Sequence, residues 1–133
     1  MNLSSALLVA VAVIACGTVG ASDARHEPVP VTIGGGRDLD ACGATAVVSG
    51  LQPVEGNLLA VRNGPGLEYT QIDGLAPDTR VWLCDRSGRW LGVVYSASGE
   101  DCGVSTPVAA HRPYSGPCVS GWVHDRYVTL EAG

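Results

Sequence analysis

The stretch Leu59-Ala60-Val61-Arg62-Asn63-Gly64-Pro65-Gly66 is the most informative part of this chain. Its first half is a short extended run, in which we expect Val61 to point inward just before the chain bends. In its second half, Pro65 fixes φ for the second position of a turn, and Gly66 can adopt the positive φ that a type II turn requires. The stretch therefore predicts a strand followed by a tight turn, which folds a long loop back over a small barrel.

The rest of the chain has the pattern of short strands separated by turn residues. The clearest pair is a hairpin, because Val81 and Leu83 alternate with Trp82, and the residues 85–88 supply a turn before a second apolar run. No segment after the N-terminal apolar run has helical periodicity. The expected strands and extended runs are 45–51, 58–62, 69–75, 80–84, 89–96, 121–124 and 128–130, with one helical turn at 125–127.

Three motifs together resemble the bacterial SH3 domain (SH3b). They are the Val-Arg-x-Gly-Pro-Gly sequence that begins at Val61, Trp90 at the start of a strand that follows a glycine turn, and Gly121-Trp122-Val123 near the end. The resemblance covers about residues 45–130. It implies an all-β fold, namely a small SH3-like five-stranded, partly open barrel of two packed sheets, with the Gly-Pro-Gly turn in the long first loop.

The chain departs from the SH3b pattern by one long insertion, residues 97–117, which precedes the strand that begins at Gly121. Family members typically have a short turn at this place. The insertion includes Cys102, closely precedes Cys118, and is rich in proline and glycine. We therefore expect an SH3b-like domain over residues 42–133 that carries a disulfide-bearing insertion.

Residues 1–21 are typical of a secretory signal peptide. The uncharged apolar run 6–15 is too short to span a bilayer as a helix. Two cleavage sites are open: the small residues 19–21 suit cleavage before Ser22, whereas Val13-Ile14-Ala15-Cys16 resembles a bacterial lipobox, in which Cys16 is lipidated. The protein is thus expected to be periplasmic or secreted, and lipid-anchored to the envelope if Cys16 is acylated. Residues 22–41, with Gly34-Gly35-Gly36, predict a flexible linker.

Four cysteines remain after either cleavage, and an even number in a small exported domain indicates two disulfides. Three connectivities are possible. We favour Cys102–Cys118, because this pair closes the insertion locally, which leaves Cys42–Cys84. A zinc site is disfavoured, because no close Cys-x-x-Cys pair occurs. No metal and no cofactor are expected.

The formal net charge of −5 argues against binding to nucleic acid, which requires clustered cations. It also argues against docking on anionic lipid. We therefore expect membrane contact only through a lipid anchor, and a partner that is a cell-wall component or an envelope protein.

Four side chains are the candidate ligand-binding residues, because aromatic rings and arginines commonly form binding surfaces. Trp82 is out of phase with its apolar neighbours, and Tyr114 lies in the insertion. Arg62 is placed either to meet a ligand carboxylate or to pair with a nearby aspartate. Trp90 and Trp122, at family core positions, are expected to be packed inside. The four candidates are Arg62, Tyr69, Trp82 and Tyr114.

The sequence does not indicate an enzyme. The three histidines, His26, His111 and His124, are scattered, the cysteines are better used in pairs, and no Gly-x-Ser-x-Gly or His-Glu-x-x-His motif occurs. The SH3b resemblance implies a non-catalytic binding module of the cell envelope that contacts peptidoglycan or its stem peptides. The alternative is an exported protein–protein interaction or scaffold domain. Binding of proline-rich peptides is not expected, because the acidic-aromatic first-loop pattern is missing.

Overall fold

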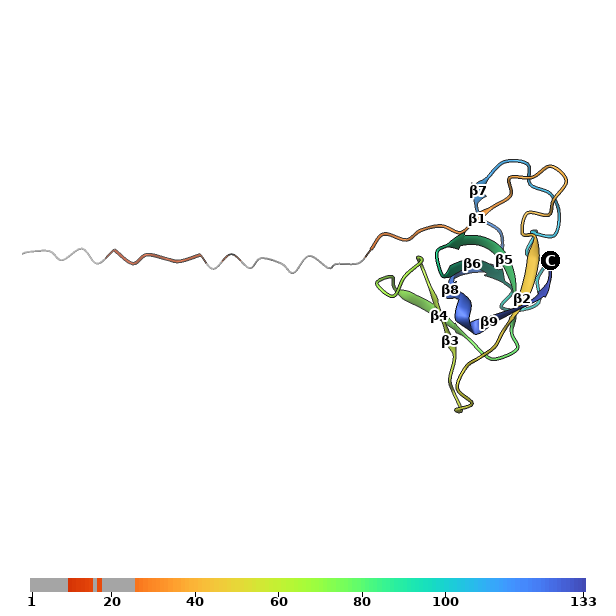
Figure 1. The fold of residues 1–133 in the computed structure, drawn as a ribbon. Helices are drawn as coiled ribbons and strands as arrows, with labels where there is room; N and C mark the ends of the chain where they lie inside the picture. Colours follow the sequence, from red (N-terminus) through yellow and green to blue (C-terminus); the bar gives the residue numbers. More distant parts are fainter. Residues whose placement is uncertain (1–9, 16, 18–25) are drawn as a thin grey trace, which may run out of the picture.

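Short strands make up almost all of the regular structure in the computed structural model, which describes residues 10–15, 17 and 26–133. The prediction of an all-β fold is therefore confirmed (Figure 1). In chain order, the elements are β1 (Thr32–Ile33), β2 (Ala44–Val48), β3 (Leu59–Arg62), β4 (Gln71–Leu75), β5 (Arg80–Ser87), β6 (Trp90–Tyr95), β7 (Arg112–Pro113), β8 (Val119–His124), the 3₁₀ turn η1 (Asp125–Tyr127) and β9 (Val128–Ala132).

Seven of these strands form one antiparallel sheet in the order β4-β3-β8-β6-β5-β2-β9, and β1 and β7 form a separate two-stranded sheet. The hairpin expected around residues 85–88 is present as β5 and β6, and β8 pairs along the other side of β6. The larger sheet is open, with β4 and β9 as its outer strands. It thus differs from the expected five strands, because β3 and β4 of the first-loop region pair with each other and β3 also meets β8.

The main core lies on one face of the sheet. Val61 is fully buried in it, as the sequence predicts, and Val81, Val93 and Val123 are at most 1% exposed. Tyr95 of β6 closes one side of this core and donates a hydrogen bond from its hydroxyl to the Asp73 carboxylate of β4, at 2.7 Å. This bond connects the β3–β4 hairpin to the centre of the sheet.

A second apolar cluster lies on the opposite face, where the insertion and the N-terminal segment cover the sheet. It contains Ile33, Val94 and Val104, with Trp82 and Tyr114 packed against it. The alternation read from the sequence is therefore correct for Trp82, but its side chain meets a second core instead of solvent. Tyr114 is likewise half-buried, because its hydroxyl bonds to the backbone on both sides of the insertion.

Both disulfides are part of this second cluster or pack against it. Cys42 is bonded to Cys84, which lies at a register shift in β5, and Cys102 is bonded to Cys118 across the insertion. The favoured pairing is thus present in the structure. Two disulfides are compatible with an extracellular location.

Of the linker expected over residues 22–41, residues 26–41 are described, and there the structure differs from the expectation. Residues 26–33, here called the strap, are hydrogen-bonded to the fold: Val29 donates to the carbonyl of Asn63 and accepts from the Trp122 indole, both at 2.8 Å. Val31 and Ile33 are 2% and 3% exposed. Even the glycines 34 and 35 donate backbone bonds, to Ala41 and Val108. A glycine- and proline-rich composition was mistaken for a flexible tether, because the partners of this segment are far away in the sequence.

The Gly-Pro-Gly turn is not the expected type II turn. Gly66 is not among the glycines with positive φ; its amide instead bonds to the carbonyl of Gly64, at 3.0 Å. The glycines serve close approach: a Cβ at Gly64 would collide with the Tyr69 ring, and one at Gly66 would collide with the Glu68 carboxylate. Gly64 is therefore required for packing against the Tyr69 ring, whereas the flexible Glu68 side chain can move away from a larger residue at position 66.

The predicted signal peptide falls largely outside the described residues, and Cys16 with it. Residues 10–15 and 17 are described, and they are exposed without regular structure. Among the described residues, no helix is both long enough and apolar enough to cross a membrane.

Candidate binding groove

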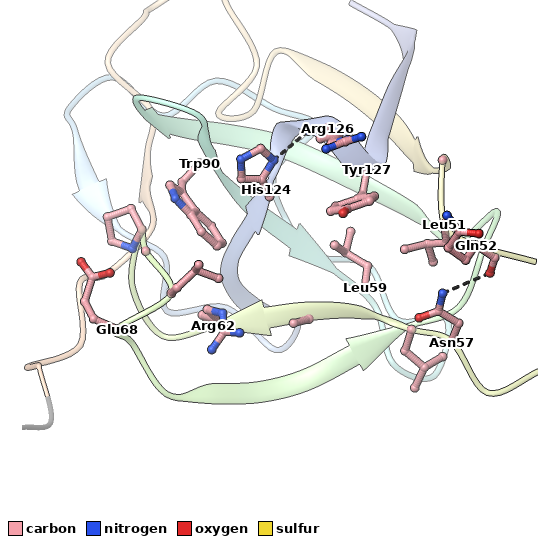
Figure 2. Close-up of a pocket in the computed structure, with 16 residues that line it drawn as sticks. Leu51, Gln52, Asn57, Leu59, Arg62, Glu68, Trp90, His124, Arg126 and Tyr127 are labelled. Atoms are coloured by element: carbon pink, nitrogen blue, oxygen red, sulfur yellow. Dashed lines mark hydrogen bonds between the residues drawn. The ribbon is translucent and has the colours of Figure 1, made fainter. Parts of the chain in front are cut away.

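An open groove of about 880 Å³ runs along β3 (Figure 2). Leu59, Ala60 and Arg62 of β3 form one side, and Trp90, His124 and Tyr127 face them. The first loop, residues 63–70, bounds the end next to Arg62 through residues 65–68. The other end is bounded by residues 50–52 and 57–58.

The three rings that face β3 form a continuous wall. Trp90 opens β6 and is the register partner of His124, which ends β8. Their rings meet edge to face, with centroids 5.4 Å apart, and the His124 and Tyr127 centroids are 6.2 Å apart. Trp90 belongs to neither apolar cluster, whereas Tyr127 packs against the main core. The wall thus has a half-buried indole that contacts the His124 ring, and a Tyr127 ring that is fixed by the main core.

Hydrogen bonds of the η1 turn hold His124 in place. Its Nδ1 accepts the backbone N–H of Arg126, at 3.1 Å, and thereby caps the turn. The proton of the neutral ring is therefore on Nε2, which can donate a hydrogen bond. Asp125 in the same turn accepts from Arg89 at 3.0 Å and lies 3.6 Å from Arg86, so the turn is also tied to the β5–β6 hairpin.

Arg62, the last residue of β3, is only partly used by the fold. Its Nη1 donates to the carbonyl of Tyr69, at 3.0 Å. Its Nε is buried without a hydrogen-bond partner among the described residues. A buried donor that lacks an acceptor costs free energy, and such groups are uncommon in folded proteins. Arg62 therefore lines the groove with a buried N–H donor that has no acceptor among the described residues.

The groove is more cationic than the chain as a whole. Its lining carries the guanidinium groups of Arg62 and Arg126, the imidazole of His124, and one carboxylate, that of Glu68. The chain has a formal net charge of −5. Apolar surface accompanies these charges, because Leu58 and Leu67 on the rim are 49% and 76% exposed. The lining suits a ligand with apolar parts and a negative group.

Only one of the four predicted ligand-binding residues lines the groove, and it is Arg62. Tyr69 lies in the first loop, where its ring meets that of His26 with centroids 5.3 Å apart. Trp82 and Tyr114 pack against the second cluster on the opposite face of the sheet. The structure therefore does not bring the four candidates together.

Sequence reasoning missed the wall of rings. Trp90 was expected inside the barrel, yet it is half-exposed and lines the groove, while Trp122 is buried as expected. A signal was available: a tryptophan that opens a strand directly after a turn stands at the rim of a sheet. The pair His124 and Tyr127 has the spacing of one 3₁₀ turn, which places both rings on the same side.

A second, smaller cavity of about 480 Å³ lies beside Cys84 and is lined by residues 34–36, 38–41 and 43. The described residues contain no group of three or more histidine, cysteine or acidic side chains arranged to hold a metal ion. His111 and His124 lie in different places, the first in the insertion beside Gly35 and the second in the groove.

Comparison with known proteins finds no matching family model, no similar curated protein and no similar solved structure. The groove is therefore the feature of the molecule that indicates its function.

Proposed function

We propose that the protein is a non-catalytic binding module of the cell envelope, which contacts peptidoglycan through its stem peptides. The observation that carries the proposal is the groove along β3, with Trp90, His124 and Tyr127 opposite Arg62. Open grooves with aromatic walls and a few polar groups suit extended peptides, because rings cover apolar side chains at a low entropic cost.

The family-level part of the proposal is an SH3b-like domain that is exported to the periplasm or secreted. Support comes from the antiparallel succession of β5, β6 and β8, from η1 between β8 and β9, and from the pairing of β2 with β5 and β9. Two disulfides accord with export. An acyl group on Cys16 would hold the module at the membrane.

Retention on purified sacculi tests this function. We expect the protein to co-sediment with sacculi at low salt, and Trp90→Ala to abolish most of the retention because it removes the largest ring of the wall. Leu130→Ala is a suitable control, since Leu130 is 64% exposed on β9 and does not line the groove. Absence of retention of the unmodified protein, or equal retention of both variants, would contradict the proposal.

The alternative function, an exported interaction or scaffold domain, is favoured by the open edges of the larger sheet. The outer strands β4 and β9 expose Ile72 and Leu130, which are 48% and 64% exposed. Unpaired strand edges can add a strand from another protein. Cross-linking in intact cells distinguishes the two functions, because a single stoichiometric protein partner would support the scaffold function.

A further inference from the structure

We propose that the groove binds the free carboxylate at the C-terminal end of a peptide, and that Arg62 holds it. This inference rests on the proposed function of the groove as a peptide site, and it adds the chemical group that the site selects. Three observations support it: the Arg62 Nε has no hydrogen-bond partner among the described residues, Arg62 lies near one end of the groove, and the lining carries more cations than anions.

Arg62 has a buried guanidinium donor that the fold leaves unsatisfied, and a carboxylate reaches it once the side chain turns toward the groove. Its Nη1 is occupied by the Tyr69 carbonyl, whereas its buried Nε has no partner among the described residues. The structure contains an example of how such a donor is used: Arg80 binds the Glu131 carboxylate through Nε and Nη2, at 2.6 and 2.7 Å. Planar two-point binding of this kind is the favoured geometry of arginine with carboxylates.

The position of Arg62 favours a chain end over an acidic side chain in mid-peptide. Arg62 is the last residue of β3, and Glu68 of the first loop follows it along the groove (Figure 2). Pro65 and Leu67 of the same loop also line the groove. A peptide that lies along β3 meets this loop after Arg62. A terminal carboxylate fits such a place, because no further residue has to continue past it.

The remaining lining is suited to the residues that precede the carboxylate. Leu59, Ala60 and Tyr127 offer apolar contact next to the Trp90 ring, and none of these side chains carries a formal charge. The one carboxylate of the lining, on Glu68, belongs to an exposed residue of the loop and opposes an anionic ligand. Its removal should therefore strengthen the binding of such a ligand.

A pair of synthetic peptides tests the inference directly. Acetyl-tetra-alanine with a free carboxylate and its C-terminal amide are titrated into ¹⁵N-labelled protein, and chemical-shift changes give the two dissociation constants. We expect the free acid to bind about tenfold more tightly, a ratio typical of one charge-assisted contact. The changes should centre on the Arg62 side chain and the Trp90 indole. Equal binding of the two peptides, or no binding of either, would overturn the inference.

Single-residue variants test whether each side chain raises or lowers the affinity for the free acid. Arg62→Gln should remove the preference for the acid, and Glu68→Gln should increase affinity for it. Arg112→Gln, on β7 in the separate two-stranded sheet, makes the same change in net charge and should leave the preference intact. If Arg62→Gln unfolds the first loop, Arg62→Lys keeps the charge but loses the planar edge, and should lose most of the preference. Weaker binding of the free acid to Glu68→Gln would contradict the inference.

The sacculus experiment separates this inference from the proposed function. Retention on sacculi without a preference for the free acid overturns only the role of Arg62. A clear preference for the acid without retention on sacculi overturns the proposed cell-wall function and leaves the carboxylate site standing.

Discussion

Tyr95 is a buried tyrosine whose hydroxyl is bonded to a carboxylate. It is 3% exposed, and its hydroxyl donates to the Asp73 carboxylate at 2.7 Å. Burial, followed by this hydrogen bond and the negative charge of Asp73, raises the pKa of Tyr95 well above its ordinary value. The neutral phenol is therefore the form that holds β4 against β6.

Replacing Tyr95 by phenylalanine should lower the free energy of unfolding by about 1.5–3 kcal/mol, the usual contribution of one hydrogen bond to a charged group. Urea unfolding at neutral pH measures this change. Because the pKa is raised in the folded state, the contribution is complete below about pH 10 and is lost as pH rises above that value. The stability of the unmodified protein should thus fall more steeply above pH 10 than that of Tyr95→Phe. Parallel curves would contradict this account.

At the scale of single elements, the insertion is closed twice. The disulfide Cys102–Cys118 joins residues 16 apart, and the Tyr114 hydroxyl donates to the Cys102 carbonyl at 2.8 Å and accepts from the Cys118 amide at 3.1 Å. Glu100 stabilises the start of the same segment, where hydrogen bonds from Ser98 and Ser96, together with its own backbone, lower the pKa of Glu100 to about 2.

The double variant Cys102→Ser/Cys118→Ser should be destabilised by roughly 3 kcal/mol, as expected for a loop of this length. Thermal unfolding under non-reducing conditions measures the loss, and Tyr114→Phe, which removes only the hydroxyl, should lose about 1 kcal/mol. Retention on sacculi should not change, because no insertion residue lines the groove. Unchanged stability would show that the disulfide adds nothing to the closure by Tyr114.

The elements differ in how far the sequence predicts them. The alternation of Val81 and Trp82 correctly defines the two faces of β5, because side-chain direction in a strand is a local property. What covers the second face depends on residues 33, 104 and 114, which are distant in the sequence, so Trp82 was interpreted as a surface residue. Arg62 is a candidate on sequence grounds alone. The rings opposite it are not, because Trp90 and His124 come together only through the pairing of β6 with β8.

At the scale of the whole molecule, the strap makes the N-terminal segment part of the fold. Val31 and Ile33 are buried, the Val31 carbonyl accepts from the Tyr114 amide, and the Thr32 amide donates to Asp85 at 2.9 Å. The sequence does not predict that the strap packs against the fold, because β1 has only two residues and is too short to show a periodic pattern. The folding unit therefore begins before residue 42, where the sequence placed the start of the domain.

The double variant Val31→Ala/Ile33→Ala should lose roughly 3–6 kcal/mol of stability, since each buried side chain contributes about 1.5–3 kcal/mol. That loss is comparable to the total stability of a small domain. Val29→Ala is the matched control: its side chain is 37% exposed, and its backbone bonds survive the substitution. Urea midpoints give the comparison. A double variant as stable as the control would mean that the strap is dispensable.

The bond from the Trp122 indole to the Val29 carbonyl also determines how the protein responds to a pull on its N-terminus. Trp122 lies on β8, an inner strand of the larger sheet. We expect tension that enters through the strap to act on β8 as well as on the first loop, because Val29 is bonded to both Trp122 and Asn63. A domain tethered by its N-terminus to a moving surface would lose these strap bonds before the larger sheet comes apart.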